Sequence, residues 1–190
     1  MRNIRKVYSD NSKQWVGDGI LVKQMFSHMG ADRGTDPFLM LDYAAPREFA
    51  PGNASHPRGV GQHPHKGFET VTIAYHGEVA HRDSTGGGGV IKEGDVQWMT
   101  AGAGIIHEEF HSEAFSQSGG LFEMVQLWVN LPAKDKNTPA RYQHLAKENI
   151  PVVQLPDNAG YLRLIAGTCE GVQGTAETFS EMNGWDGVVN

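Results

Sequence analysis

The sequence predicts an all-β protein, and three observations lead to this fold class. Gly occurs 24 times among the 190 residues, well above the usual share of about 7%, and so many glycines indicate many turns. Short runs of β-branched and aromatic residues, such as ETVTIAY at 69–75, are typical of strands. The sequence has no long Ala-, Leu-, Glu- and Lys-rich run of the kind that forms helices.

The expected strands follow one another along the first 132 residues, separated by clusters of Gly, Pro, Asp and Asn. They are expected at 2–8, 19–26, 36–44, 69–75, 79–83, 90–100 (two short strands around a turn at 93–95), 101–110 and 119–132. The last is the longest apolar run, which predicts a central strand. The stretch from Ala45 to Gln62 is rich in Pro, Gly, Arg and Ser and predicts a long loop, either a functional lid or a disordered segment.

A change in composition after residue 132 predicts a domain boundary. Residues 133–150 are charged and contain Pro139, so we expect a linker at 133–145 with one helical turn. The predicted division is a domain at 1–132, this linker, and a β segment at 146–190 with strands at 152–155 and 161–168.

The charge and the cysteine content exclude several classes of protein. The net charge is −6, and Lys and Arg form no basic stripe, which disfavours direct binding to nucleic acid. The single cysteine, Cys169, cannot form an internal disulfide, which fits a reducing compartment, and we expect it to be an inert buried thiol. Neither a signal peptide nor an apolar run of about 18 residues is present, so we expect a cytoplasmic protein without a membrane span.

Two pairs of side chains point to a metal site. His63 and His65 flank Pro64, and an extended backbone places both imidazoles on one face of a strand. His107 and Glu109 repeat this spacing on a second segment. If both segments are strands that face one interior, three imidazoles and one carboxylate converge on one divalent ion. A set without thiolate suits Fe(II), Mn(II), Ni(II), Cu(II) or Zn(II), and four protein ligands leave room for a substrate.

Spacing alone leaves the identity of the metal carboxylate open. Glu69 has the same parity as His63 and His65, so it is either an alternative metal ligand or an acceptor that orients a ligand imidazole. Glu108 has the opposite parity to His107 and is expected to point away from the metal.

Several nearby residues have both a structural and a functional interpretation. His76, His81 and His111 are expected to be surface or turn histidines, and so is His56 in the long loop. Five large side chains are expected in the core, with an aromatic substrate pocket as the alternative: Trp98, Met99, Phe122, Met124 and Trp128. Gln126 needs a hydrogen-bond partner if it is buried, which makes it a candidate neighbour of the metal site.

Four segments carry a resemblance to a known family. DPFLMLDY (36–43), HPHKGFETVTI (63–73), EGDVQWMTAGAGIIHEEF (93–110) and LWVNLP (127–132) closely resemble the pirin family of the cupin superfamily. The resemblance implies a cupin fold, a double-stranded β-helix or jelly-roll-like β-barrel built from two antiparallel sheets. It also implies Fe(II) as the metal, with Ni, Cu, Mn and Zn as alternatives, bound by His63, His65, His107 and Glu109. In this family the second pair supplies the carboxylate, which favours Glu109 over Glu69.

The resemblance implies two alternative functions. One is that of a metal-dependent dioxygenase of the quercetin 2,3-dioxygenase type, which cleaves a flavonol with O₂ and releases carbon monoxide and a depside. Glu109 would then be the catalytic base that accepts the proton of the 3-hydroxyl group. The other is that of an iron-binding, redox-responsive regulator that acts through contacts with a protein partner. A cupin that binds metal for stability alone is the third possibility.

The segment after residue 145 departs from the family pattern. Pirins carry a second cupin domain after the linker, and the residues here are too few for one, so we expect that domain to be incomplete. Its two strands would leave open edges that a folded protein covers or pairs. Three explanations compete: the strands pack back onto the first barrel, which we favour, they form a dimer, or the second domain is broken. A monomer and a homodimer are both consistent with the sequence.

Overall fold

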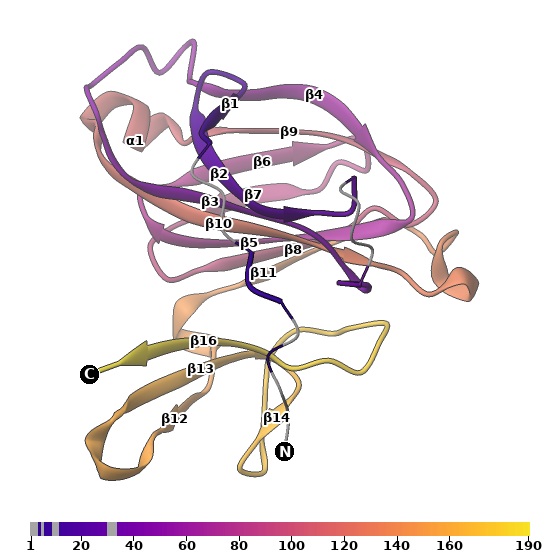
Figure 1. The fold of residues 1–190 in the computed structure, drawn as a ribbon. Helices are drawn as coiled ribbons and strands as arrows, with labels where there is room; N and C mark the ends of the chain where they lie inside the picture. Colours follow the sequence, from indigo (N-terminus) through magenta and orange to yellow (C-terminus); the bar gives the residue numbers. More distant parts are fainter. Residues whose placement is uncertain (1–3, 5, 9–11, 30–33) are drawn as a thin grey trace.

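Two antiparallel sheets lie face to face in the upper part of Figure 1. The structure, a computed structural model, describes residues 4, 6–8, 12–29 and 34–190. The all-β prediction is confirmed, since α1 (Glu113–Ser118) is the single α-helix among these residues and only short 3₁₀ turns accompany it. Part of the strand expected at 2–8 lies outside the described residues, and positions 4 and 6–8 are not in a strand.

The larger sheet has seven strands in the described part of the chain, and all neighbours pair antiparallel. In spatial order these are β1 (Gln14–Val16), β2 (Ile20–Ser27), β3 (Phe38–Phe49), β10 (Gly120–Asn130), β5 (Phe68–His76), β8 (Val96–Thr100) and β11 (Arg141–Leu145). The prediction that the longest apolar run forms a central strand is confirmed, because β10 pairs with β3 on one side and β5 on the other.

The smaller sheet carries most of the histidines of interest. Its order is β4 (Gly59–His65), β9 (Ile105–His111), β6 (Val79–Asp83) and β7 (Gly88–Ile91). Along β9, buried residues alternate with exposed or half-buried ones. This period of two places His107, Glu109 and His111 in one row on the face turned toward the larger sheet.

The core between the sheets is apolar at the end near α1. It is built from buried residues of both sheets and of α1: Ile20, Val22, Ala44, Phe49, Ala74, Phe122 and Met124 from the larger sheet, Val79 and Ile91 from the smaller one, and Phe115 from the helix. The described strands of the sandwich remain two separate hydrogen-bonded sheets and do not close into one continuous barrel. The cupin-type sandwich therefore holds together by side-chain packing between its layers.

Three segments differ from the sequence-based expectation. The loop expected at 45–62 is confined to residues 50–58, because β3 continues to Phe49 and β4 begins at Gly59. Part of the expected linker is strand β11, which pairs with β8 and completes the edge of the larger sheet. Helix α1 was not expected, because one and a half turns are too short for a helical period to show in the sequence. Ser112 caps it by accepting a hydrogen bond from the Phe115 backbone N–H at 3.0 Å.

The C-terminal segment forms its own small sheet below the sandwich in Figure 1. This sheet orders as β12 (Val152–Gln154), β13 (Gly160–Ala166) and β16 (Gly184–Val189), next to a hairpin of β14 (Thr168–Cys169) and β15 (Val172–Gln173). The predicted strands at 152–155 and 161–168 are confirmed within one to two residues. The division of the chain into domains stays a prediction.

The C-terminal segment packs back onto the larger sheet, as the favoured explanation predicted. Ile165 and Ala166 of β13 share one buried cluster with Trp98 and Val129. The Tyr75 hydroxyl also donates a hydrogen bond to Asp186 Oδ1 at 3.1 Å. This cover explains why every residue of β8 is buried, since the strand is enclosed on both faces. None of the described helices is long and apolar enough to span a bilayer.

Candidate metal centre

The register of β4 and β9 brings three imidazoles together at one end of the sandwich. His63 lies directly opposite His107, and His65 is two residues further along β4. The three ring centroids form a triangle with sides of 4.3 Å (His63–His107), 4.8 Å (His63–His65) and 4.8 Å (His65–His107). One ring nitrogen of each lies within 4.8 Å of one on each of the others. A single cation therefore fits among them after small rotations of the rings.

Local structure of β4 fixes the direction of His63. The pairing of β4 with β9 shifts register between Val60 and His63, which is a bulge, and bulges re-aim side chains next to functional sites. His63 Nδ1 donates a hydrogen bond to the Gly61 carbonyl at 2.8 Å. This bond leaves the Nε2 lone pair of His63 free for a metal ion.

Burial keeps His65 and His107 in the neutral form that a metal requires. The pKa of His65 is lowered to about 4, first by burial and then by the charge of His63. The pKa of His107 is lowered to about 2, first by burial and then by His63, His65 and His81. Neutral imidazoles are metal ligands and imidazolium ions are not.

Glu109 reaches into the interior toward the larger sheet, where two amides hold its carboxylate. Gln97 of β8 donates a short hydrogen bond to Oε1, and Gln126 of β10 donates one of 3.0 Å to Oε2. The interpretation of Gln126 as a neighbour of the metal site is supported by this contact. Glu109 forms a second group of possible ligands with His81 and His107, in which the donor atoms lie within 4.8 Å of one another.

The alternative carboxylate, Glu69, has a different environment. It is buried, accepts a hydrogen bond of 2.6 Å from the Thr100 hydroxyl, and has a raised pKa because of burial. Among the described residues it belongs to neither group of possible ligands. Glu109, and not Glu69, therefore lies within reach of one histidine of the triangle, His107, and its role as the metal carboxylate stays a prediction. Glu108, which is half-buried, lines a separate pocket.

A cavity of about 280 Å³ opens beside the histidine triangle. His63, His65 and Glu109 form part of its wall, and apolar side chains form most of the remainder: Val16, Ile20, Val22, Met40, Val60, Met124 and Trp128. Three polar residues that the sequence gave no reason to select also line it: Gln14, Gln24 and Asp42. Burial raises the pKa of Asp42. The cavity has the size and apolar character of a small-molecule site with a few polar groups.

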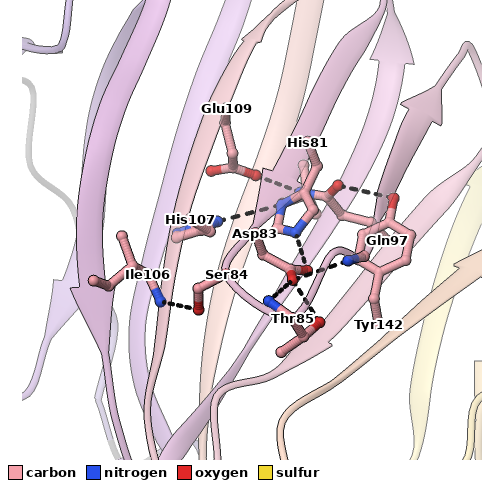
Figure 2. A network of polar contacts seen from close by, with 11 residues as sticks. His81, Asp83, Ser84, Thr85, Gln97, Ile106, His107, Glu109 and Tyr142 are labelled. Carbon is pink, nitrogen blue, oxygen red and sulfur yellow. Dashed lines mark hydrogen bonds and ion pairs between the residues drawn. The ribbon is translucent and has the colours of Figure 1, made fainter.

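A buried polar network behind His107 was also missed by sequence reasoning (Figure 2). Besides the proposed ligands, it includes His81 and Asp83 of β6, Gln97 of β8 and Tyr142 of β11. The prediction that His81 is a surface or turn histidine is wrong, since its side chain is 0% exposed. The parity of His81 and Asp83, which lie on the same face of one strand, was a signal that could have been used. Tyr142 gave no such signal, because it lies in the segment expected to be a linker.

The other candidate residues divide between the core and the cavity. The core interpretation is confirmed for Trp98, Met99, Phe122 and Met124, although Met124 also lines the cavity. Trp128 is half-buried and lines the cavity. The prediction for His111 is wrong, because that side chain is buried among aromatic rings. His76 and His56 are more exposed, as expected, and Cys169 is half-buried.

A divalent metal fits this set of residues. The Nε2 atom of His107 is buried and has no hydrogen-bond partner among the described residues, a costly arrangement that a metal bond would satisfy. Three imidazoles and one carboxylate without a thiolate suit first-row metals.

Comparison with known proteins identifies the family. The model of the family described as Pirin matches residues 19–129. The chain belongs to the pirin family. A crystal structure of a pirin relative, quercetin 2,3-dioxygenase from Acinetobacter baumannii, superposes with a TM-score of 0.90 at 57% identity and covers 95% of this chain. The match confirms the cupin-type fold.

Curated relatives support the same family assignment. A Pseudomonas aeruginosa protein named "Putative quercetin 2,3-dioxygenase" is 56% identical over 98% of this chain, and Pirin-like protein 2 of Arabidopsis thaliana is 39% identical over 92% of it. The chain spans 64% of the Pseudomonas protein, 49% of the Arabidopsis protein and 62% of the Acinetobacter chain. It therefore corresponds to the greater part of two of these relatives and about half of the third.

Proposed function

We propose that this pirin is a metal-dependent dioxygenase that cleaves flavonols such as quercetin with O₂. The observation that carries the proposal is the convergence of His63, His65 and His107 beside an apolar cavity, whose wall includes His63 and His65. The names of the Acinetobacter and Pseudomonas relatives support the choice of substrate.

The proposed cofactor is one divalent ion bound by His63, His65, His107 and Glu109, with Fe(II) as the first choice and Ni, Cu, Mn and Zn as alternatives. When bound, such an ion supplies Lewis-acid chemistry and, in the case of iron, redox chemistry. Glu109 contributes the negative charge that partly balances the ion.

The chain's own residues supply the proton transfer and the binding site. Glu109 accepts the proton of the flavonol 3-hydroxyl group, and the amides of Gln97 and Gln126 hold its carboxylate in place. The apolar wall that includes Met40, Met124 and Trp128 packs against the flat rings and excludes water. Asp42 and Gln24, which share a hydrogen bond of 3.4 Å, offer polar contacts to the phenolic hydroxyls.

Oxygen consumption tests this proposal. The protein loaded anaerobically with Fe(II) is mixed with quercetin and O₂, next to His65→Ala and the control His76→Ala, which removes a more exposed histidine outside the cluster. We expect carbon monoxide release by the native chain and by His76→Ala, and at least about a 100-fold loss of turnover in His65→Ala. Absence of turnover in the metal-loaded native chain would refute the enzyme, and redox-dependent binding to a protein partner would then support the regulator.

A further inference from the structure

A chain of three buried polar side chains extends from His107 away from the proposed metal. His81 Nδ1 lies 3.3 Å from His107 Nδ1, and His81 Nε2 lies 3.0 Å from Asp83 Oδ2. The side chains of His81 and Asp83 are both 0% exposed. We call Asp83, His81 and His107 the histidine relay, and Figure 2 shows all three with their contacts.

The partners of Asp83 define the direction of the hydrogen bonds in the relay. Its Oδ1 accepts hydrogen bonds from the Thr85 N–H (2.8 Å), the Thr85 hydroxyl (2.6 Å) and the Gly87 N–H (3.2 Å). These donors favour the carboxylate, which can only accept, so His81 must donate from Nε2. A neutral His81 then accepts at Nδ1, and His107 must donate from its own Nδ1. The remaining lone pair of His107 is on Nε2, the buried atom without a hydrogen-bond partner.

We propose that Asp83 and His81 are positioning residues that hold the proton of His107 on Nδ1 and thereby present its Nε2 lone pair to the metal ion. This inference rests on the proposed function, because it takes His107 as a metal ligand. It adds two residues that touch neither the metal nor the cavity, and it assigns a tautomer to the most deeply buried of the three proposed ligand histidines.

The surroundings of the relay hold it rigidly. On the ladder between β6 and β9, Asp83 is paired with His107 and His81 with Glu109, so the backbone fixes their spacing. The ring of Tyr142 stacks on His81 with centroids 4.7 Å apart and planes 21° apart. The Tyr142 hydroxyl donates to Gln97 Oε1 at 3.3 Å, and Gln97 in turn holds Glu109. One network therefore orients both ligands that β9 supplies.

Asp83→Asn is the most direct test, because it keeps the shape of the side chain and reverses the direction of the hydrogen bonds in the relay. The asparagine oxygen stays with the Thr85 and Gly87 amides, so its NH₂ group faces His81 and donates to it. His81 then donates to His107 from Nδ1, and the proton of His107 moves to Nε2, where it opposes metal binding. The matched control is Asp95→Asn. Asp95 also accepts from loop amides and from a histidine, His144 at 3.1 Å, but lies outside the relay.

Two measurements test the expected effect of Asp83→Asn. Ring ¹⁵N chemical shifts of the metal-free protein, assigned with His107→Gln, report the tautomer of His107. We expect Nδ1–H in the native chain and in Asp95→Asn, and Nε2–H in Asp83→Asn. Titration with Ni(II) as the probe should show affinity about 10- to 100-fold lower in Asp83→Asn. A native His107 protonated on Nε2, or unchanged Ni(II) affinity in Asp83→Asn, would overturn the inference.

A second pair of variants keeps the test valid if Asp83→Asn fails to fold. A glutamine amide can accept from His107 and donate to Asp83, so His81→Gln should keep the Nδ1–H tautomer and Ni(II) affinity within a few-fold. His81→Leu fills a similar volume without hydrogen bonds and should lose about 10- to 100-fold in affinity. Loss of binding in both variants would make His81 itself a ligand and overturn the inference.

The outcomes also separate this inference from the proposed function. A native chain with the expected tautomer and Ni(II) affinities that fails to cleave quercetin would refute the function alone. Quercetin cleavage by the native chain, together with a His107 tautomer that is unchanged in Asp83→Asn, would refute the proposed role of the relay alone.

Discussion

The two ends of β9 place the same residue type in two different environments. His107 and His111 both belong to the inward row of this strand and are both buried. His107 faces His63 and His65 and keeps an unsatisfied Nε2 atom. His111 donates from Nε2 to the Gly19 carbonyl at 3.0 Å, so its hydrogen-bonding need on that atom is met within the chain.

The neighbours of His111 are those of a core residue. Phe49, Phe115 and Phe122 surround its ring at centroid distances of 4.7, 5.1 and 4.8 Å. A pocket of about 120 Å³ lies beside it, and His111 is not in either group of possible metal ligands among the described residues. The parity of a position on the strand determines whether a histidine points into the sandwich. The residues that contact it from distant strands determine whether it is placed to bind a metal ion or packs in the core.

The largest expected difference between the two ends is in metal affinity. His107→Ala should abolish measurable binding of Ni(II), because it removes one of the four proposed ligands. His111→Ala should leave the affinity within about threefold, since additive effects are expected at separate sites. Isothermal titration on both variants measures this, and equal losses in the two would contradict the distinction.

The next largest effect is on stability, and it should fall on the other end of the sandwich. Phe122→Ala removes a fully buried ring from the cluster around His111 and should lower the free energy of unfolding by about 3–5 kcal/mol. The affinity for Ni(II) should be unchanged at temperatures where the variant is folded. Urea denaturation measures the first quantity, and a loss below about 1 kcal/mol would show that this cluster is not the core of the sandwich.

A smaller effect is expected from the amide that holds the carboxylate of Glu109. Gln126→Leu removes the 3.0 Å hydrogen bond to Oε2 and should lower kcat for quercetin about tenfold, because a hydrogen bond to a charged group contributes about 1.5–3 kcal/mol. The melting temperature serves as the control for folding. Unchanged kcat in a stably folded Gln126→Leu protein would contradict the role of this amide.

The sequence selected the four residues of the proposed metal site but not the residues around them. The parity of His63, His65, His107 and Glu109 required only that β4 and β9 be strands, and a period of two is a local property. Gln97 and Tyr142 could not be selected, because their importance depends on how β8 pairs with β5 and β11. The resemblance to pirins, in contrast, predicted the fold from long segments that local patterns alone would have left ambiguous.

Two errors have the same physical cause. The burial of His111 and the strand β11 both arise from packing against elements far away in the sequence, namely Phe49 and β8. The charged composition of 133–150 indicated a linker, yet β11 pairs along its whole length with a strand that is buried on both faces. Tertiary pairing overrides local composition in such places.

The most gradual effect is the dependence of stability on pH. Burial lowers the pKa of His65, His107 and His111, so the unfolded metal-free chain binds protons that the folded chain does not. The free energy of unfolding should therefore have its highest value above about pH 6.5 and should decrease as the pH falls toward 4. His111→Phe should reduce this slope in urea denaturation at pH 7 and pH 5, and an identical slope would place the pH dependence elsewhere.

The position of a bound metal tests the central claim most directly. Anomalous diffraction from crystals of the Ni(II)-loaded protein locates the ion without assuming its ligands. The expected result is one ion about 2.0–2.2 Å from ring nitrogens of His63, His65 and His107 and from a carboxylate oxygen of Glu109. An ion bound by His81 in place of His63 and His65, or found outside the sandwich, would contradict it.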